Sequence, residues 1–267
     1  MMGRIAGADA ELPDQTRNTE AALEPRDRII VALDVDGAEA AVALARSVGR
    51  YVGAVKVGLE LVHAAGLDIF DRLHDAGIPR IFYDCKLHDI PNTVAGAARA
   101  IAKRRVWMMN VHASGGSRMV QSAAVALRDA VHGDHPPLLV AVTLLTSLSV
   151  EELYRELRVG LTPENYVVDL ARMARTAGAR GVVASPQEVR AIRDACGPEF
   201  LIVTPGIRPT GTESGDQRRT ATPGDAIRSG ATYLVVGRPI TAAPDPVGAA
   251  QSVLAEVEAA CTSSPGR

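Results

Sequence analysis

An apolar run ends in three closely spaced charges in the stretch Ile81-Phe82-Tyr83-Asp84-Cys85-Lys86-Leu87-His88-Asp89-Ile90-Pro91-Asn92-Thr93. If the run is a β-strand, its side chains alternate between two faces, so Asp84 and Lys86 point the same way at its end. A lysine held between carboxylates at a strand end is suited to act as a protonated catalytic acid. The alternative is a solvated turn with Asp89 as a helix cap. The stretch alone leaves both interpretations open.

Seven further short apolar runs lie along the chain, and a segment with helical periodicity follows each of the eight. Alternating strands and helices predict a parallel sheet with right-handed crossovers. Eight such units in about 230 residues predict a single-domain α/β protein, a closed (β/α)8 or TIM barrel. An open doubly wound sheet is the second possibility, but no Gly-x-Gly-x-x-Gly motif follows the first run. The predicted strands are residues 29–34, 54–58, 81–83, 107–112, 138–145, 181–185, 200–204 and 233–238. The predicted helices are residues 38–48, 66–76, 93–103, 119–130, 150–157, 163–176, 186–195, 223–229 and 247–260.

The composition fits this architecture. Of 267 residues, 47% are hydrophobic but only 3% are aromatic, so the core must be aliphatic, as in a buried parallel sheet. The net charge of −2 gives no global attraction to nucleic acid or to a membrane surface. No apolar run approaches the roughly 18 residues of a membrane span.

The cysteines and the chain ends bear on location and domain boundaries. Cys85, Cys196 and Cys261 show no paired spacing, which argues for a reducing compartment and against a disulfide framework or a cysteine zinc site. We therefore predict a cytoplasmic protein. Residues 1–27 lack the apolar core of a secretory signal and are predicted to be a loosely ordered extension. Residues 28–261 would form the catalytic barrel, and residues 262–267 a polar tail.

Residues typical of function fall where the predicted strands end. In a TIM barrel the active site lies at the carboxyl ends of the strands. Any one of these residues could simply be polar where a strand meets solvent, but their convergence on one rim favours a site. They are Asp34, Lys56, Asp84 with Lys86, His112, Thr146, Gly206 with Arg208, and Gly237 with Arg238.

The ends of the seventh and eighth strands predict a phosphate site. Thr204-Pro205-Gly206-Ile207-Arg208 and Val236-Gly237-Arg238-Pro239 each place a glycine close to an arginine. Barrels of this kind often bind phosphate at these two loops, where glycine lets backbone N–H groups approach and arginine pairs with the anion. The intervening loop, about residues 209–220 with Gly215-Asp216-Gln217-Arg218-Arg219, has the composition of a mobile lid.

The charges at the second and third strands argue for proton transfer by an ammonium group. Carboxylates near Lys56 and Lys86 favour the charged form of lysine, whereas a Schiff-base lysine must be neutral. Such a lysine can stabilise a developing negative charge and then donate a proton. Asp84 and Asp89, with Glu60 or His88, could instead ligate Mg²⁺. The intervening lysines oppose a dication, so we predict no metal.

Residues 28–255 resemble the bacterial type of the orotidine 5'-phosphate decarboxylase family. The pattern Asp-x-Lys-x-x-Asp-Ile-Pro-Asn-Thr is highly specific, and further blocks follow in the same order. The blocks are Val31-Ala32-Leu33-Asp34, Val55-Lys56-Val57-Gly58, residues 84–93, Asn110-Val111-His112-Ala113-Ser114-Gly115-Gly116, Val142-Thr143-x-Leu145-Thr146-Ser147, Val203-Thr204-Pro205-Gly206-Ile207-Arg208-Pro209, Gly215-Asp216-Gln217-Arg218-Arg219 and Gly237-Arg238-Pro239.

This resemblance implies cofactor-free conversion of orotidine 5'-monophosphate to UMP and CO2, the last step of pyrimidine synthesis. It implies that Lys86 protonates C6 and that Asp84 lies beside the leaving carboxylate and orders the lysines. It also implies a homodimer, with no nucleic-acid or membrane partner, in which Asp89, Ile90 and Thr93 reach into the partner's site. Asp89 and Lys56 are catalytic by the same resemblance. The implied substrate contacts are Asp34 and Lys56 at the ribose, Thr146 at the pyrimidine, and Pro205, Arg208, Gln217, Gly237 and Arg238 toward the phosphate.

Two features depart from relatives, and two alternative functions remain. Cys85 and Leu87 replace larger or different apolar residues, and alternation predicts that Cys85 faces away from the pocket. A Mg²⁺-dependent sugar-phosphate decarboxylase shares the Asp-x-Lys-x-x-Asp pattern, but carries a glutamate ligand where this chain has Lys56. The other alternative is a non-catalytic nucleotide-binding barrel.

Overall fold

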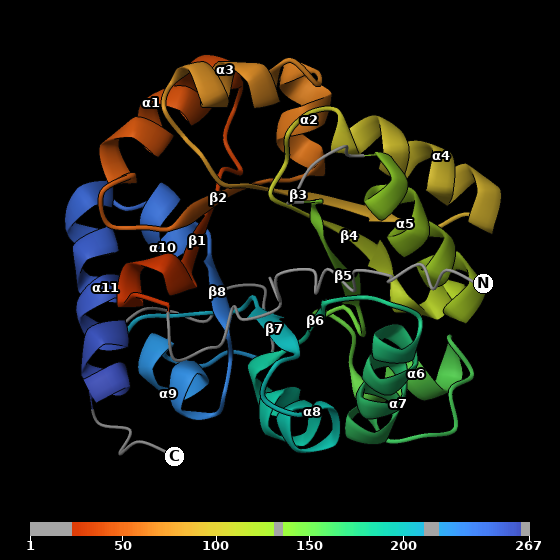
Figure 1. Cartoon of the computed structure of the whole chain (residues 1–267). Coiled ribbons are helices and arrows are strands. Elements are labelled where there is room, and N and C mark those ends of the chain that lie inside the picture. Colours follow the sequence, from red (N-terminus) through yellow and green to blue (C-terminus); the bar gives the residue numbers. More distant parts are fainter. Residues whose placement is uncertain (1–22, 131–135, 211–218, 263–267) are drawn as a thin grey trace, which may run out of the picture.

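A computed structural model describes residues 23–130, 136–210 and 219–262. Within these residues, eight parallel strands pair in chain order, and the first also pairs with the last, so the sheet closes into a barrel. Helices surround the strands, as Figure 1 shows. The predicted TIM barrel is confirmed.

The eight described strands follow one another in the order predicted from the sequence. The strands are β1 Ile29–Ala32, β2 Ala54–Val57, β3 Ile81–Leu87, β4 Met108–His112, β5 Leu138–Val142, β6 Gly181–Val183, β7 Leu201–Thr204 and β8 Tyr233–Val236. The α-helices are α1 Ala38–Val48, α2 Leu59–Ala65, α3 Ile69–Asp75, α4 Pro91–Ala102, α5 Ser117–Ala130, α6 Val150–Arg155, α7 Pro163–Thr176, α8 Val189–Cys196, α9 Pro223–Arg228, α10 Arg238–Thr241 and α11 Pro246–Thr262. The described residues also contain the 3₁₀ turns η2 Pro25–Arg28, η3 Ala113–Gly115 and η4 Pro186–Glu188.

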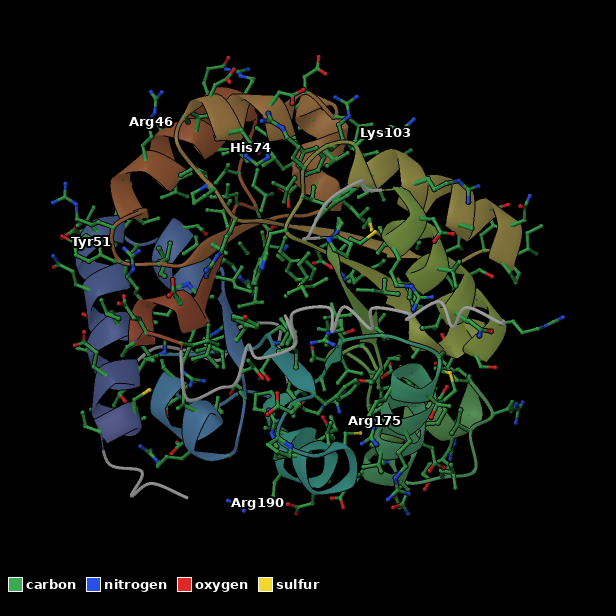
Figure 2. The ribbon with its side chains drawn as sticks, viewed as in Figure 1. Arg46, Tyr51, His74, Lys103, Arg175 and Arg190 are labelled. Atoms are coloured by element: carbon green, nitrogen blue, oxygen red, sulfur yellow. The ribbon has the colours of Figure 1, made fainter. Side chains whose placement is uncertain are left out.

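Alternation along the strands separates two apolar layers. On β1, Ile30 packs inside the barrel, whereas Ile29 and Val31 pack outward against the helices. The helices meet the sheet through small residues, such as Ala41 and Ala45 of α1, which are fully buried. This close approach of helix to strand explains how a chain with few aromatic residues fills its core. Charged side chains labelled in Figure 2, including Lys103 and Arg190, lie on the periphery.

The structure corrects several predicted boundaries. The helix predicted at residues 66–76 corresponds to α3, which is shorter and runs from Ile69 to Asp75. Helix α2, at Leu59–Ala65, was not predicted; it ends before Gly66, whose φ of +74° breaks the helix. Strand β3 continues to Leu87 rather than ending near Tyr83. Helix α10, which begins at Arg238 directly after β8, was not predicted.

The chain ends lie mostly outside the described residues. Of the predicted N-terminal extension, the structure describes residues 23–27, which lead into η2 at the start of β1. There Asp27 forms an ion pair with Arg80 at 3.4 Å. Helix α11 runs to Thr262, and the predicted domain boundaries stay predictions. In the part of the chain that is described, every helix is too short or too polar to cross a membrane.

Candidate active site

A pocket of about 550 Å³ lies at the carboxyl ends of the strands. Its volume is in the range of small-molecule sites. The loops that follow the strands bring together residues from distant parts of the sequence, because all parallel strands of a barrel end on the same face. Nine predicted site residues line this pocket: Asp34, Lys56, Asp84, Lys86, Thr146, Pro205, Arg208, Gly237 and Arg238.

Four of these side chains form a chain of alternating charge. Lys56 Nζ lies 3.2 Å from Asp34 Oδ1 and 3.3 Å from Asp84 Oδ2. Lys86 Nζ lies 2.7 Å from Asp84 Oδ1. Gly58 makes room for this arrangement, since a Cβ there would come within 2.9 Å of Lys56 Nζ. The ammonium of Lys56 thus lies between the carboxylates of Asp34 and Asp84. A divalent cation bound by these two carboxylates would need the same space.

Asp84 is the centre of this network and is held ionised. Burial is the largest influence on its pKa and opposes ionisation. The charges of Lys56 and Lys86, with hydrogen bonds from Lys86 and Asn110, outweigh burial and hold the pKa of Asp84 below its ordinary value. The Asp84 carboxylate therefore favours its ionised form and forms ion pairs with both Lys56 and Lys86 in the pocket.

The backbone at Lys86 is not that of a regular strand. The register between β3 and β4 shifts between Tyr83 and Leu87, and Lys86 has a φ of +48°. Asp84 and Lys86 do line the same pocket, as predicted, but simple alternation along the strand is not the reason. The irregular backbone and their ion pair bring the two side chains together. Cys85 is buried in the layer against the helices, as predicted, and burial raises the pKa of its thiol to about 11.

Two arginines, Arg208 and Arg238, also line the pocket and lie close enough to interact electrostatically. Burial, and then the charge of Arg238, lower the pKa of Arg208 from its ordinary value. The positive charges of the two guanidinium groups repel each other. An anion bound between them relieves that repulsion. Gly206 and Gly237 line the same part of the pocket.

Three predicted site residues, Asp89, Ile90 and Thr93, are not brought into the pocket. Asp89, Ile90 and Thr93 are exposed at the start of α4 and do not line it. The carboxylate of Asp89 accepts a hydrogen bond from the backbone N–H of Ile90 at 2.6 Å, and Ile90 is 66% exposed. Gln217 lies outside the described residues, as does most of the predicted lid. An exposed apolar residue beside a carboxylate suits contact with another molecule.

Possible metal ligands do not converge. Glu60 and Asp84 line the pocket, but His88 and Asp89 are exposed. Within the described ranges, no three His, Cys, Asp or Glu side chains gather as a metal site would require. The ring of His112, predicted at the rim, lies 5.5 Å from that of His88 and does not line the pocket.

The sequence interpretation missed an ion pair behind the rim. Arg219 and Glu188 form a buried ion pair, with side chains 11% and 5% exposed. Arg219 also donates to the backbone carbonyl of Leu145 at 3.0 Å, next to Thr146. The pair joins the loops after β5, β6 and β7. No local pattern signals it, because Glu188 lies in a segment that reads as an ordinary helix.

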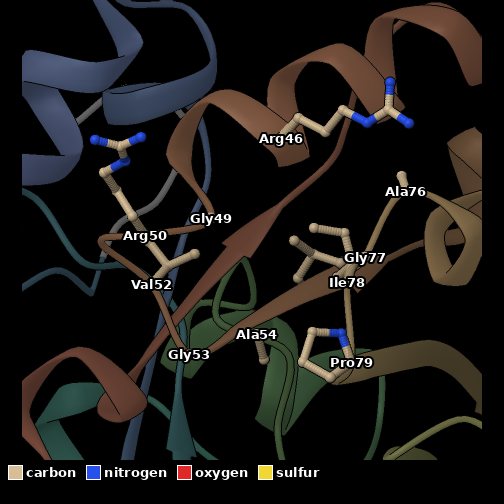
Figure 3. Close-up of a pocket in the computed structure, with 11 residues that line it drawn as sticks. Arg46, Gly49, Arg50, Val52, Gly53, Ala54, Ala76, Gly77, Ile78 and Pro79 are labelled. Carbon is tan, nitrogen blue, oxygen red and sulfur yellow. The ribbon is translucent and has the colours of Figure 1, made fainter.

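A second cavity, of about 290 Å³, lies at the other end of the barrel (Figure 3). It is formed where α1 ends and β2 begins, and its lining includes Ile78 and Pro79. In Figure 3, the side chains of Arg46 and Arg50 extend away from these two residues. Glycines and apolar residues make up most of its remaining lining. It therefore offers fewer charged and polar side chains for binding or catalysis than the pocket at the carboxyl ends of the strands.

The fold and the pocket define a TIM-barrel enzyme whose charged groups converge at the carboxyl ends of its strands. Residues 27–253 match the model of the orotidine 5'-phosphate decarboxylase / HUMPS family. The chain belongs to this family, as the sequence resemblance indicated.

Individual relatives agree with this assignment. The chain is 53% identical over 238 residues to orotidine 5'-phosphate decarboxylase of Moorella thermoacetica, covering 88% of this chain and 94% of that protein. It is 46% identical to the protein of the same name from Syntrophomonas wolfei, covering 88% of this chain and all of the relative. The solved structure of orotidine 5'-phosphate decarboxylase from Lactobacillus acidophilus superposes with a TM-score of 0.77 at 42% identity, covering 86% of this chain and 99% of that one.

Proposed function

We propose that this protein decarboxylates orotidine 5'-monophosphate to UMP and CO2 without a cofactor, the last step of pyrimidine synthesis. One observation carries the proposal: Asp84 forms ion pairs with Lys56 and Lys86 in a pocket that Arg208 and Arg238 also line. Kinship with proteins named for this reaction supports the choice.

The proposed chemistry follows from the charges. When the C6–carboxylate bond breaks, CO2 leaves and its bonding electron pair stays on C6 as a carbanion. The Lys86 ammonium stabilises this negative charge and then transfers a proton to C6, which gives UMP. The resulting neutral amine regains a proton from water. Lys56 and Asp34 would hold the ribose hydroxyls, and Thr146 would contact the pyrimidine.

An absorbance assay with orotidine 5'-monophosphate tests the proposal directly. We expect loss of the substrate band, formation of UMP and an unchanged rate in EDTA. Activity that disappears in EDTA and returns with Mg²⁺ would instead favour the metal-dependent sugar-phosphate class. Binding of UMP without any turnover would favour a non-catalytic nucleotide-binding barrel.

The rim of the pocket is proposed to bind the substrate phosphate. Arg208 and Arg238 would supply paired hydrogen bonds, with Pro205, Gly206 and Gly237 shaping the backbone around the anion. Gln217 is assigned to the same group by family resemblance alone. Binding energy from this remote phosphate can contribute to turnover as well as to affinity.

Substitution of Arg238 tests this phosphate site. We expect Arg238→Ala to raise the KM by about 10–100-fold, since a hydrogen bond between charged groups contributes about 1.5–3 kcal/mol. The kcat should change much less. Steady-state kinetics would measure both constants.

Arg190→Ala is the matched control for this prediction. Arg190 is exposed and lies on the periphery in Figure 2, so its loss removes one positive charge far from the pocket. We expect wild-type constants from this variant. An unchanged KM in Arg238→Ala would remove that residue from the phosphate site.

We further propose a homodimer in which each subunit completes its partner's site. Asp89, Ile90 and Thr93 are exposed at one end of α4 and lie outside their own pocket. Their exposure leaves a carboxylate and an apolar side chain ready to contact a second copy of the chain. In a symmetric dimer the two contributions would be equivalent.

Mixing two inactive variants tests the shared site. Lys86→Ala and Asp89→Asn should each be nearly inactive alone. After mixing and exchange of subunits, half of the dimers carry one intact site, so about a quarter of wild-type activity should return by the statistics of a symmetric dimer. Absence of any recovery, with subunit exchange verified by differently tagged chains, would show that the sites are not shared.

The cytoplasmic location stays a prediction. All three cysteines are free, and two of them, Cys85 and Cys196, are buried. Free thiols persist in reducing compartments, which supports the proposal.

A further inference from the structure

Asn110 is a completely buried polar residue on β4, behind the floor of the pocket. Both ends of its side-chain amide are used. Its Nδ2 donates to Asp84 Oδ1 at 2.7 Å, and its Oδ1 accepts from the backbone N–H of Lys86 at 2.7 Å. The amide therefore holds both the carboxylate of Asp84 and the backbone of Lys86, the proposed proton donor.

The second of these bonds falls at the irregular point of β3. The ladder between β3 and β4 loses its register between Tyr83 and Leu87, and Lys86 adopts a φ of +48°. A residue with a side chain rarely adopts this conformation unless the surroundings impose it. The Asn110 carbonyl oxygen supplies the acceptor that the regular ladder would otherwise offer to the Lys86 N–H.

The first bond fixes the acceptor of the Lys86 ammonium. Asp84 Oδ1 receives both the Asn110 amide and Lys86 Nζ, each at 2.7 Å. With Oδ1 fixed on one side by a rigid, buried donor, the ammonium on the other side has little freedom to move. An amide is suited to this position because it offers one donor and one acceptor, whereas a carboxylate would repel Asp84.

We propose that Asn110 is a positioning residue, which sets the place of the Lys86 ammonium by fixing its backbone and its carboxylate partner together. This inference rests on the proposed decarboxylase function, because the ammonium position matters only if Lys86 acts at the reacting carbon. Asn110 itself does not line the pocket, so it acts through Asp84 and Lys86.

Two substitutions test the proposal. Asn110→Leu keeps the approximate volume and removes both hydrogen bonds. Asn110→Asp keeps the shape and the acceptor for the Lys86 N–H, but turns the donor toward Asp84 into a second carboxylate. The measurements are kcat and KM for orotidine 5'-monophosphate, the Kd for UMP, the thermal unfolding midpoint, and kcat as a function of pH.

Thr143→Val is the matched control. Thr143 is 5% exposed, and its hydroxyl donates to the backbone carbonyl of Val183 at 3.0 Å, away from the charged network. The substitution also removes a buried hydrogen bond at the carboxyl end of the barrel. It should lower stability to a similar degree while leaving kcat at the wild-type level.

We expect Asn110→Leu to lower kcat by about 10–100-fold, the range found when supporting contacts of functional groups are removed. The Kd for UMP should stay within about threefold of the wild type, since ribose and phosphate contacts are retained. In Asn110→Asp, two adjacent carboxylates should share a proton at low pH, which restores a donor toward Asp84. Its kcat relative to the wild type should therefore rise as the pH falls.

Two results would overturn the proposal. One is a folded Asn110→Leu protein with wild-type kcat, or with a loss of kcat matched by an equal loss of UMP affinity. The other is a plot of kcat against pH for Asn110→Asp that runs parallel to the wild-type plot. This second measurement also tests the proposal if Asn110→Leu fails to fold. An inactive wild-type protein would instead refute the proposed function.

Discussion

Lys86→Ala is expected to lower kcat by at least about 10⁴-fold, because it removes both a general acid and a preorganised positive charge at the reacting carbon. Lys86 Nζ lies 2.7 Å from Asp84 Oδ1. The chain has only three lysines, and the one near Lys86 is Lys56, whose ammonium is already held between Asp34 and Asp84. No other lysine can therefore replace the ammonium of Lys86. The Kd for UMP should change little. Single-turnover kinetics and calorimetric titration with UMP would measure the two effects.

Lys103→Ala is the control for this experiment. Lys103 is exposed at the end of α4 and lies on the periphery in Figure 2, so its removal should leave kcat and UMP binding unchanged. A Lys86→Ala enzyme that stayed active would refute the assignment of the proton donor. Loss of UMP binding together with activity would indicate that Lys86 shapes the pocket rather than the reaction.

Asp84→Asn is expected to lower kcat by about 10²–10³-fold with little change in KM. The substitution leaves Lys56 and Lys86 without the carboxylate that holds them, and a displacement of about 1 Å can reduce the rate about 100-fold. Asp225→Asn is a suitable control, since Asp225 forms an exposed ion pair with Arg228 on α9. If Asp84 acted mainly by repelling the substrate carboxylate, its removal would lower kcat and KM together.

The same variant should alter the pH dependence of stability. The pKa of Asp84 is lower in the folded protein than its ordinary value of 3.8, so ionised Asp84 favours folding above that pH. This contribution is lost as the pH falls through the lowered pKa of the folded state. Asp84→Asn should therefore be less stable than the wild type at neutral pH, and the difference should shrink on acidification. Denaturant titrations at pH 7 and pH 3 would measure it; equal differences at both would contradict the ion-pair role.

Much of the barrel could be predicted from local patterns. The apolar runs of β1 and β8 and the periodicity of α1 and α7 depend on neighbours a few positions away, and these are visible in the sequence. Helix α2 was missed because its seven residues are too few to show a clear period. Gly66, with its left-handed backbone, separates it from α3. Helix α10 was missed because four residues are too few to show a period.

The rim of the pocket was also largely predictable, for a topological reason. Once eight parallel strands are assigned, their carboxyl ends must share one face, so Asp34, Lys56, Asp84 and Thr146 had to converge there. The roles of Asp89, Ile90, Thr93 and Gln217 rest on family resemblance and stay predictions. The first three lie outside their own subunit's pocket, and the fourth lies outside the described residues.

The barrel, its functional end and the types of charged residue there could be predicted from the sequence alone, because each follows from short-range periodicity and strand order. How those charges are held depends on long-range contacts in the folded chain. Asn110 meets Asp84 from 26 positions away, and Arg219 meets Glu188 from 31 positions away. Such contacts depend on the register of neighbouring strands and on closure of the barrel, which no local pattern encodes. The left-handed backbone of Lys86 has the same origin, since it is stabilised by a side chain on the next strand.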